Sequence, residues 1–337
     1  MIRVSKPRAN TRSLAAAAMV VASSLCFYAA AQQQVPAAPA DAGAPSAPTP
    51  TASAAPVFPA PDPANFTATS PTKDVVNAFL SASWGYDENR IWQVEGIFKT
   101  SIDGVSKVVA YVGDKTGKTK PVIMQFYAMP DGKHIIASDE IINFGANPFA
   151  DFRTLLEQRA DGPYRGTASK ELEFVEFADF QCPHCKEAQP NMEKLAVDFP
   201  NARFVFQNFP LPQHPAAAGA AAYGVCVNKL GGSVAFFKFA NAVFEGQDGL
   251  NQGADGSTLT LNSAVTTAGL DPVKVEACSK TSEVEAQVKA SAQLARDLNI
   301  NQTPALMVNG RQVPAGAPYD VLKQIILYQE KLDGIKQ

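Results

Sequence analysis

Apolar residues first recur at helical spacing around residue 75 and then alternate with polar residues from Trp92 onward, which predicts one helix followed by strands. We expect Ser70 to cap the helix, Pro71 to occupy its first turn and Gly85 to end it. Residues 66–150 therefore read as a small α+β domain with an antiparallel meander. The four strand-like runs of this domain cover 92–98, 105–112, 122–128 and 134–142. They are separated by turns that contain Gly and Asp.

A second pattern begins after residue 170 and predicts an α/β domain over 170–337. Residues 151–169 before it are expected to form a connecting helix and a hinge. Within the helix-rich block over 215–298, four aromatic residues at helical spacing are expected to pack in the core: Phe236, Phe237, Phe239 and Phe244. The other expected elements are strands over 171–178, 203–208, 304–309 and 311–314, and helices over 184–198 and 318–332.

The first 65 residues carry no pattern of a folded domain. Basic residues precede an uncharged stretch that ends at Ala31, and this order is typical of a signal peptide over 1–31. An uncleaved membrane anchor is the alternative, because the uncharged stretch is nearly long enough to span a bilayer. Residues 32–65 are rich in Ala and Pro and are expected to be a linker. The sequence thus predicts a periplasmic or otherwise exported protein, with anchoring to the membrane as the alternative.

The net charge and the cysteine content restrict the set of possible functions further. The formal net charge is −3 at pH 7, which argues against nucleic acid as a partner. Of the five cysteines, Cys26 lies within the predicted signal peptide, and the remaining four suggest two pairs in an oxidising compartment. We expect Cys226 and Cys278 to form a structural disulfide within the helix-rich block. Two buried free thiols are the alternative.

The segment Cys182-Pro183-His184-Cys185 carries the predicted chemistry. It stands between a predicted strand and a predicted helix, where free N–H groups and the helix dipole stabilise a thiolate at Cys182. Pro183 fits the first helical turn, because its missing N–H costs nothing there. Cys185 lies one turn further and can close a disulfide with Cys182. We therefore predict a redox-active dithiol, with Cys182 as the nucleophile and Cys185 as the resolving thiol.

Other uses of these residues stay open. Cys182 could be half of a structural disulfide, or the cysteine pair could be two ligands of a zinc site. Zinc normally takes four protein ligands, however, and the sequence holds no second Cys-X-X-Cys. We expect neither a metal nor an organic cofactor. His184 is expected to lower the pKa of Cys182 through its ring, and a surface histidine without a role is the alternative. His134, beside a predicted turn, is expected to be a solvated side chain.

Two segments of the C-terminal domain resemble the DsbA type of thioredoxin-fold proteins. Residues 176–185 are similar to the active-site strand and turn of that family, and residues 301–311 are similar to its cis-proline loop and following hairpin. The helical block between them is similar as well, including residues 212–216. The resemblance implies the α/β fold class, with a thioredoxin-like fold that carries a helical insertion over 215–298 and is preceded by the small α+β domain.

The resemblance also implies roles for residues outside the cysteine motif. Thr303 and Pro304 are expected to be joined by a cis peptide bond beside the dithiol, where the backbone binds an extended substrate peptide. A trans proline that opens a strand is the alternative. The family has an acidic residue at the place of Glu176, which implies a buried proton acceptor for the resolving thiol. The alternative for Glu176 is an exposed edge carboxylate, and Asp179 is expected to be a turn residue.

The N-terminal domain is loosely similar to the dimerisation domain of the disulfide isomerases DsbC and DsbG. The similarity lies in the order of helix and strands and in residues 127–134, and it implies a homodimer through 66–150.

The expected function is an exported thiol–disulfide oxidoreductase that acts on cysteines of secreted proteins and is reset by an unidentified redox partner. The Cys-Pro-His-Cys motif resembles oxidases, whereas Thr303 and the N-terminal domain resemble isomerases or reductases, so the direction of electron flow stays open. A dimeric periplasmic chaperone or binding module is the alternative.

Overall fold

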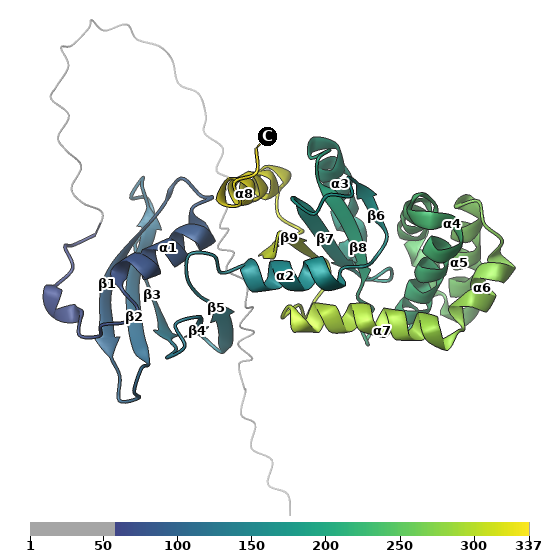
Figure 1. Cartoon of the computed structure of the whole chain (residues 1–337). Coiled ribbons are helices and arrows are strands. Elements are labelled where there is room, and N and C mark those ends of the chain that lie inside the picture. Colours follow the sequence, from purple (N-terminus) through teal and green to yellow (C-terminus); the bar gives the residue numbers. More distant parts are fainter. Residues whose placement is uncertain (1–57, 337) are drawn as a thin grey trace, which may run out of the picture. The chain divides into compact units, whose positions relative to one another are not determined.

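The computed structural model describes residues 58–336 (Figure 1). The predicted signal peptide over 1–31 and most of the predicted linker over 32–65 lie outside the described residues. Within the described part of the chain, no helix is both long and apolar enough to cross a membrane.

The N-terminal domain consists of one helix packed on an antiparallel sheet of order β1-β2-β3-β4-β5. Phe79, Phe126 and Phe144 meet in its core between helix and sheet. A short 3-10 helix, η1 (Pro63–Asn65), precedes the domain. The elements are α1 (Lys73–Trp84), β1 (Arg90–Lys99), β2 (Ser106–Asp114), β3 (Val122–Ala128), β4 (His134–Ala137) and β5 (Glu140–Asn143).

Two details of this domain differ from the sequence prediction. The N-cap of α1 is Thr72, whose hydroxyl accepts a hydrogen bond from the Val75 N–H at 3.3 Å, and not Ser70. The Ser70 carbonyl instead accepts a hydrogen bond from the Ser106 hydroxyl, which ties the segment before the helix to the sheet. The run over 134–142 is not one strand, because Ser138 adopts a φ of 57° and turns the chain into the hairpin of β4 and β5.

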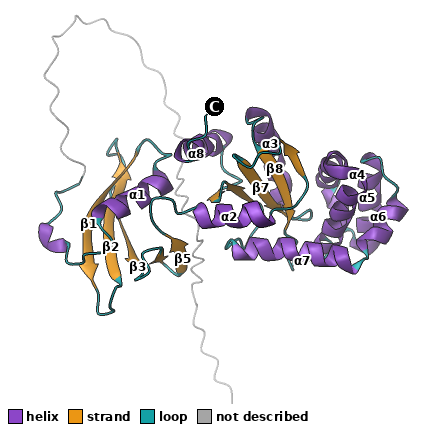
Figure 2. Cartoon of the chain, viewed as in Figure 1, coloured by secondary structure: helices purple, strands orange, loops and turns teal. Residues whose placement is uncertain are grey.

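The C-terminal domain is built on a sheet with helices around it (Figure 2). The sheet has five strands in the order β10-β9-β7-β8-β6, and β7 and β8 are parallel. Side chains alternate between its two faces along β7: Phe174 joins the core with α3 and α8, and Val175 joins the core with α2 and α7. The strands are β6 (Tyr164–Gly166), β7 (Glu173–Ala178), β8 (Arg203–Asn208), β9 (Ala305–Val308) and β10 (Arg311–Val313). The helices around the sheet are α2 (Ala150–Arg159), α3 (Pro183–Asp198), α7 (Ser282–Asp297) and α8 (Tyr319–Leu332).

The segment predicted as a connecting helix and hinge lies against this domain. Leu156 of α2 and Ala160, which follows that helix, are buried in the same cluster as Val175. The strand β6, which the sequence did not predict, pairs antiparallel with β8. The connecting segment is therefore part of the C-terminal core.

The helical insertion follows β8 and includes α7. Phe236 and Phe239 of α4 are fully buried and contact Phe180 beside the cysteine motif, so the core of the insertion extends to the candidate site. The other elements of the insertion are α4 (Ala217–Glu245), η2 (Gln247–Asn251), α5 (Gly253–Thr267) and α6 (Pro272–Ser279).

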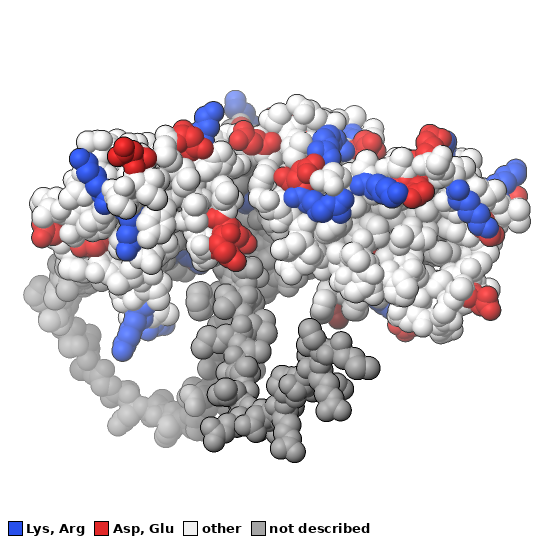
Figure 3. Space-filling model, turned by 90° about the horizontal axis from the view of Figure 1, so that it is seen from below, with Lys and Arg blue, Asp and Glu red and all other residues white. Residues whose placement is uncertain are grey.

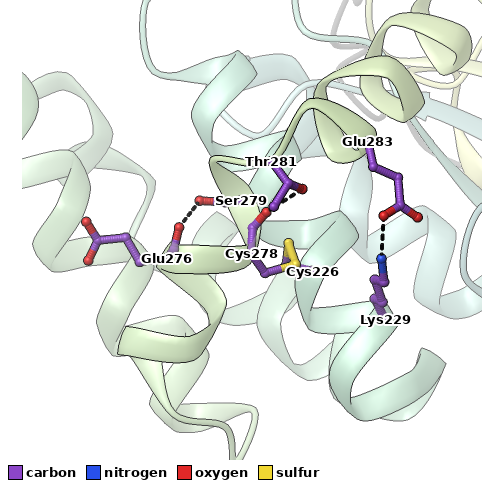
Figure 4. Close-up of a disulfide and its surroundings, with 7 residues drawn as sticks. All are labelled: Cys226, Lys229, Glu276, Cys278, Ser279, Thr281 and Glu283. Carbon is purple, nitrogen blue, oxygen red and sulfur yellow. Dashed lines mark hydrogen bonds and ion pairs between the residues drawn. A yellow bond between two sulfur atoms is a disulfide. The ribbon is translucent and has the colours of Figure 1, made fainter.

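A disulfide joins Cys226 of α4 to Cys278 of α6 (Figure 4), with the two Cα atoms 5.9 Å apart. The bond closes a segment with a sequence separation of 52 residues. Loss of chain entropy in the unfolded state by such a closure contributes about 4 kcal/mol. The bond therefore holds two insertion helices together, beside the same core cluster that contains Cys182 and Cys185.

Charged side chains of both signs are interspersed on the face shown in Figure 3. Lys and Arg lie beside Asp and Glu there, and no large patch of a single sign is present on this face. This mixture agrees with the small formal net charge of −3.

Candidate active site

The cysteine motif lies where β7 ends and α3 begins. Cys182 is the N-cap residue of α3 and Pro183 its first residue, so both occupy the positions that the sequence predicts for them. Cys182 and Cys185 are free thiols. Cys182 is 4% exposed and Cys185 is fully buried, which leaves Cys182 as the more accessible sulfur of the pair.

The surroundings of the two sulfurs shift their pKa values in opposite directions. The pKa of Cys182 is lowered to about 5, first because the Cys185 thiol donates a hydrogen bond to its sulfur. Thr303 and the backbone N–H groups of Cys185 and His184 add to this effect, against the opposing effect of burial. Burial in turn raises the pKa of Cys185, and the neighbouring Cys182 raises it further. At neutral pH the pair thus holds one thiolate, at Cys182, and one thiol.

The loop before β9 lies against the nucleophilic sulfur. The Thr303–Pro304 peptide bond is cis, and the Cys182 sulfur lies 3.6 Å from the Thr303 carbonyl oxygen. The structure therefore brings together two motifs that are 121 residues apart in the sequence.

Glu176 lies inside the domain, on β7, with 8% of its surface exposed. Its Oε1 accepts a hydrogen bond of 2.9 Å from the Gln189 side chain of α3. Burial raises the pKa of Glu176 to about 7, although the hydrogen bond from Gln189 and the charge of Arg165 oppose the increase. This carboxyl can therefore take or release a proton near neutral pH.

The His184 side chain is 73% exposed, and its Nδ1 lies 2.9 Å from Oε2 of Glu187. Glu187 is the main cause of a raised pKa of His184, and the Cys182 thiolate adds a smaller effect. The structure thus gives the ring a carboxylate partner that the sequence interpretation missed. The spacing of three residues on a helix is the signal that could have indicated it.

Asp179 does more in the structure than end a strand. Its carboxylate is buried and accepts hydrogen bonds from the backbone N–H groups of Gln181 and Leu211, and its Oδ2 lies 2.7 Å from Nδ1 of His214. Its own backbone N–H donates to the Cys185 sulfur at 3.4 Å. Asp179 therefore links the turn before Cys182 to the loop that leads into the insertion.

Two glutamines, neither predicted from the sequence, link the same turn to the insertion, one from the insertion and one from the turn itself. Gln247 of η2 is buried and donates hydrogen bonds of 2.9 Å to the carbonyls of Phe180 and Cys182. Gln181 donates to the Asn251 side chain at 2.8 Å and accepts from the Ala216 N–H at 2.7 Å. No local sequence signal points to these contacts, because they depend on how the insertion packs.

Among residues 58–336, no group of three or more His, Cys, Asp or Glu side chains is arranged to hold a metal ion.

Comparison with known proteins gives a match to a family model described as Thioredoxin over residues 158–327, which is half of the chain. The chain is 26% identical over 176 residues to disulfide bond formation protein D of Bacillus subtilis, covering 51% of this chain and 78% of that protein. It is also 41% identical over 58 residues to the Na(+)/H(+) antiporter NhaA 3 of Salinispora tropica, covering 17% of this chain and 9% of the antiporter. The chain thus spans about a tenth of that antiporter.

Among solved structures, DsbA2 of Pseudomonas aeruginosa is similar, with 28% sequence identity and a TM-score of 0.44. That similarity covers 50% of this chain and 93% of DsbA2.

Proposed function

We propose, from the premise that this chain belongs to the thioredoxin family, that it is an exported thiol–disulfide oxidoreductase acting on cysteines of secreted proteins. One observation carries the proposal: Cys182 caps helix α3, and its pKa is lowered to about 5 by the Cys185 thiol and the surrounding donors. A thiolate is the nucleophile in disulfide exchange, so this sulfur is reactive at neutral pH.

In the reducing direction, the Cys182 thiolate attacks a substrate disulfide, forms a mixed disulfide and releases one substrate sulfur as a thiolate. Cys185 then gives its proton to the carboxylate of Glu176, and its thiolate attacks the Cys182 sulfur. The Cys182–Cys185 disulfide forms, the second substrate sulfur leaves, and two electrons have passed to the substrate. In the oxidising direction the same steps run in reverse.

The residues around the dithiol support a site for an extended substrate chain. The backbone at Thr303 and Pro304 lies beside the Cys182 sulfur, and a substrate strand could pair with it while its cysteine meets Cys182. A second protein or membrane component with its own redox pair resets the dithiol. Neither metal nor organic cofactor takes part in this proposal.

The direction of electron flow depends on the reduction potential of the dithiol relative to its partners, and the stability of the thiolate contributes to that potential. A strongly lowered pKa of Cys182 stabilises the reduced form and makes the disulfide a better oxidant, which supports an oxidase. The resemblance of Thr303 and of the N-terminal domain to isomerases or reductases supports the opposite role. We favour the oxidase because the lowered pKa belongs to the reacting sulfur itself.

Refolding of a small disulfide-containing protein tests this function. An oxidase restores activity to the fully reduced substrate, whereas an isomerase also restores activity to a substrate with scrambled disulfides. The Cys182→Ser variant is the control and should be inactive in both assays. A wild-type protein that accelerates neither reaction and shows an ordinary thiol pKa at Cys182 would contradict the proposal.

Export is part of the proposal and rests on the signal peptide predicted over 1–31. The mass of the mature protein recovered from the periplasm, or from the corresponding exported fraction, tests it. Cleavage after Ala31 gives a chain that begins at Gln32, whereas an anchored protein keeps residues 1–31 and stays with the membrane.

A dimeric periplasmic chaperone or binding module is the second candidate. The supporting observation is that Ile123, Tyr127 and Ile141 are exposed on the sheet of the N-terminal domain, and the strand register places Tyr127 and Ile141 on the same face. Such a face suits a homodimer through 66–150. A variant with Cys182→Ser and Cys185→Ser that keeps full biological function would favour this candidate over the oxidoreductase.

A further inference from the structure

Gln189 lies on α3 one turn after Cys185 and connects two parts of the candidate active site. Its side-chain amide donates a hydrogen bond of 2.9 Å to Oε1 of Glu176 and another of 3.1 Å to the backbone carbonyl of Cys185. Nothing in the spacing of the cysteine motif points to this residue, because Glu176 lies on the strand and Gln189 on the helix. One amide thus joins the buried carboxyl to the backbone of the resolving cysteine.

We propose that Gln189 is a positioning residue of the thiol chemistry, whose amide holds the Glu176 carboxylate in its ionised form against the backbone of Cys185. The inference rests on the proposed function, in which Glu176 accepts the proton of Cys185. A buried carboxylate without a donor is strongly disfavoured relative to the neutral acid. Among the described residues, Gln189 is the side chain that donates a hydrogen bond to this carboxyl.

The other groups around Glu176 do not replace this hydrogen bond. Arg165 lowers the pKa of Glu176 and Glu193 raises it, but these two side chains pair with each other through hydrogen bonds of 2.8 Å. On the neighbouring strands, Glu176 stands opposite Phe206 of β8 and Leu306 of β9, both uncharged. The direct donor on α3 is therefore the group that favours the ionised form at short range.

Loss of this hydrogen bond affects the second chemical step, in which Cys185 attacks the Cys182 sulfur. The proton of the Cys185 thiol passes to the Glu176 carboxylate, and the Cys185 thiolate then displaces the partner sulfur from Cys182. Without the amide of Gln189, Glu176 stays protonated up to a higher pH, and fewer molecules have a base ready for this proton. The first step, attack by the Cys182 thiolate, does not use Glu176 and should keep its rate.

Oxidised glutathione is the probe that separates the two steps. It reacts with Cys182 to give a mixed disulfide and one glutathione, and Cys185 then releases the second glutathione. We expect Gln189→Leu to move the pH midpoint of the second release upward by about one unit and to slow it about tenfold below that midpoint. Gln189→Glu, which keeps the size of the side chain but adds a second carboxylate, should move the midpoint upward as well.

Two comparisons make the test specific to Glu176. In a Glu176→Gln background, Gln189→Leu should produce no further change in the pH profile. Asn191→Ala on the same helix, whose side chain donates to the Ala317 carbonyl instead, should keep the wild-type midpoint. An unchanged midpoint in both Gln189 variants, or a shift that persists in the Glu176→Gln background, would overturn the inference. A wild-type protein that forms the mixed disulfide but never resolves it would instead contradict the proposed function.

Discussion

At the scale of single residues, the reactivity of Cys182 depends on its partner thiol more than on the helix that it caps. The Cys185 thiol is the largest cause of the lowered pKa of Cys182, and backbone N–H groups of the first helical turn add smaller effects. The resolving cysteine thus serves twice: its proton stabilises the nucleophile before exchange, and its sulfur closes the disulfide afterwards.

This dual role predicts the behaviour of two substitutions at Cys185. Wild-type Cys182 should react with iodoacetamide with a half-maximal rate near pH 5, and Cys185→Ala should move that midpoint upward by at least about one pH unit. Cys185→Ser keeps a hydroxyl that can donate to the sulfur, so its midpoint should lie between the other two. Identical profiles for the Ala and Ser variants would show that the donated hydrogen bond is not the cause.

His184 is expected to affect the redox equilibrium through charge. Its imidazolium attracts the Cys182 thiolate, but the ring is exposed and paired with Glu187, so salt should weaken the attraction. We predict that His184→Gly makes the reduction potential more negative, measured against glutathione, and that the difference from wild type shrinks as ionic strength rises. An unchanged potential at low salt would rule out this role.

The sequence predicts the thiol pair because the spacing of two cysteines and the strand-to-helix order are local features. It indicates Glu176 and Pro304 only through resemblance to a family. Glu187 could have been indicated by its spacing of three residues from His184, whereas Gln189 and Gln247 stay hidden, because glutamine is common on helices and its role arises from the groups that it meets.

At the scale of elements, the turn between β7 and α3 is held from outside by the insertion. Gln247 of η2 donates to the carbonyls of Phe180 and Cys182, and the ring of Phe180 packs among the aromatic side chains of α4. The insertion therefore supports the backbone on which the nucleophile sits, in addition to any role toward substrates.

Removal of this support should alter both stability and thiol acidity. We predict that Gln247→Leu lowers the free energy of unfolding by about 1–3 kcal/mol, because buried carbonyls lose their donor. The pKa of Cys182 should rise, since the N–H groups that face its sulfur are no longer held in place. Denaturant unfolding and the pH profile of alkylation measure the two effects.

The control for this prediction is Tyr223→Phe. The Tyr223 hydroxyl of α4 donates a hydrogen bond of 3.4 Å to the Asn262 side chain of α5, within the insertion. This variant should lose stability while its alkylation profile stays that of the wild type. A Gln247→Leu protein with the same unshifted profile would mean that Gln247 serves stability alone.

The hydrophobic pattern of the sequence predicts some helices and strands well and misses others. The helices α1 and α3 follow from periodicity, because each buries one apolar face. The strands β7 and β8 follow instead from short apolar runs, which are buried on both faces of the sheet. The hairpin of β4 and β5 was predicted as one strand, since its turn at Ser138 contains neither Gly nor Pro. The strand β6 has three residues, too few to show a hydrophobic period. It forms because its backbone pairs with the edge of β8.

At the scale of the whole molecule, one buried arginine connects the two domains. Arg311 of β10 is 4% exposed and donates to the carbonyls of Ala82 and Ser83 at the end of α1, and its Nε donates to the Gln329 side chain at 2.7 Å. Its guanidinium also lies 4.1 Å from the centre of the Phe149 ring. Although burial lowers the pKa of Arg311 to about 10, the group is charged at neutral pH, where it suits the negative end of the α1 dipole.

The position of Arg311 predicts that the domains unfold together. It follows β9 in the hairpin after Pro304, so the same short segment contacts the active-site sulfur and the N-terminal domain. We expect Arg311→Leu to split a single calorimetric transition into two, because carbonyls of α1 lose their donor and the domains lose a shared anchor. Arg159→Ala, which removes an exposed arginine paired with Asp297 inside the C-terminal domain, should keep one transition. A single transition at the wild-type temperature in Arg311→Leu would show that other contacts couple the domains.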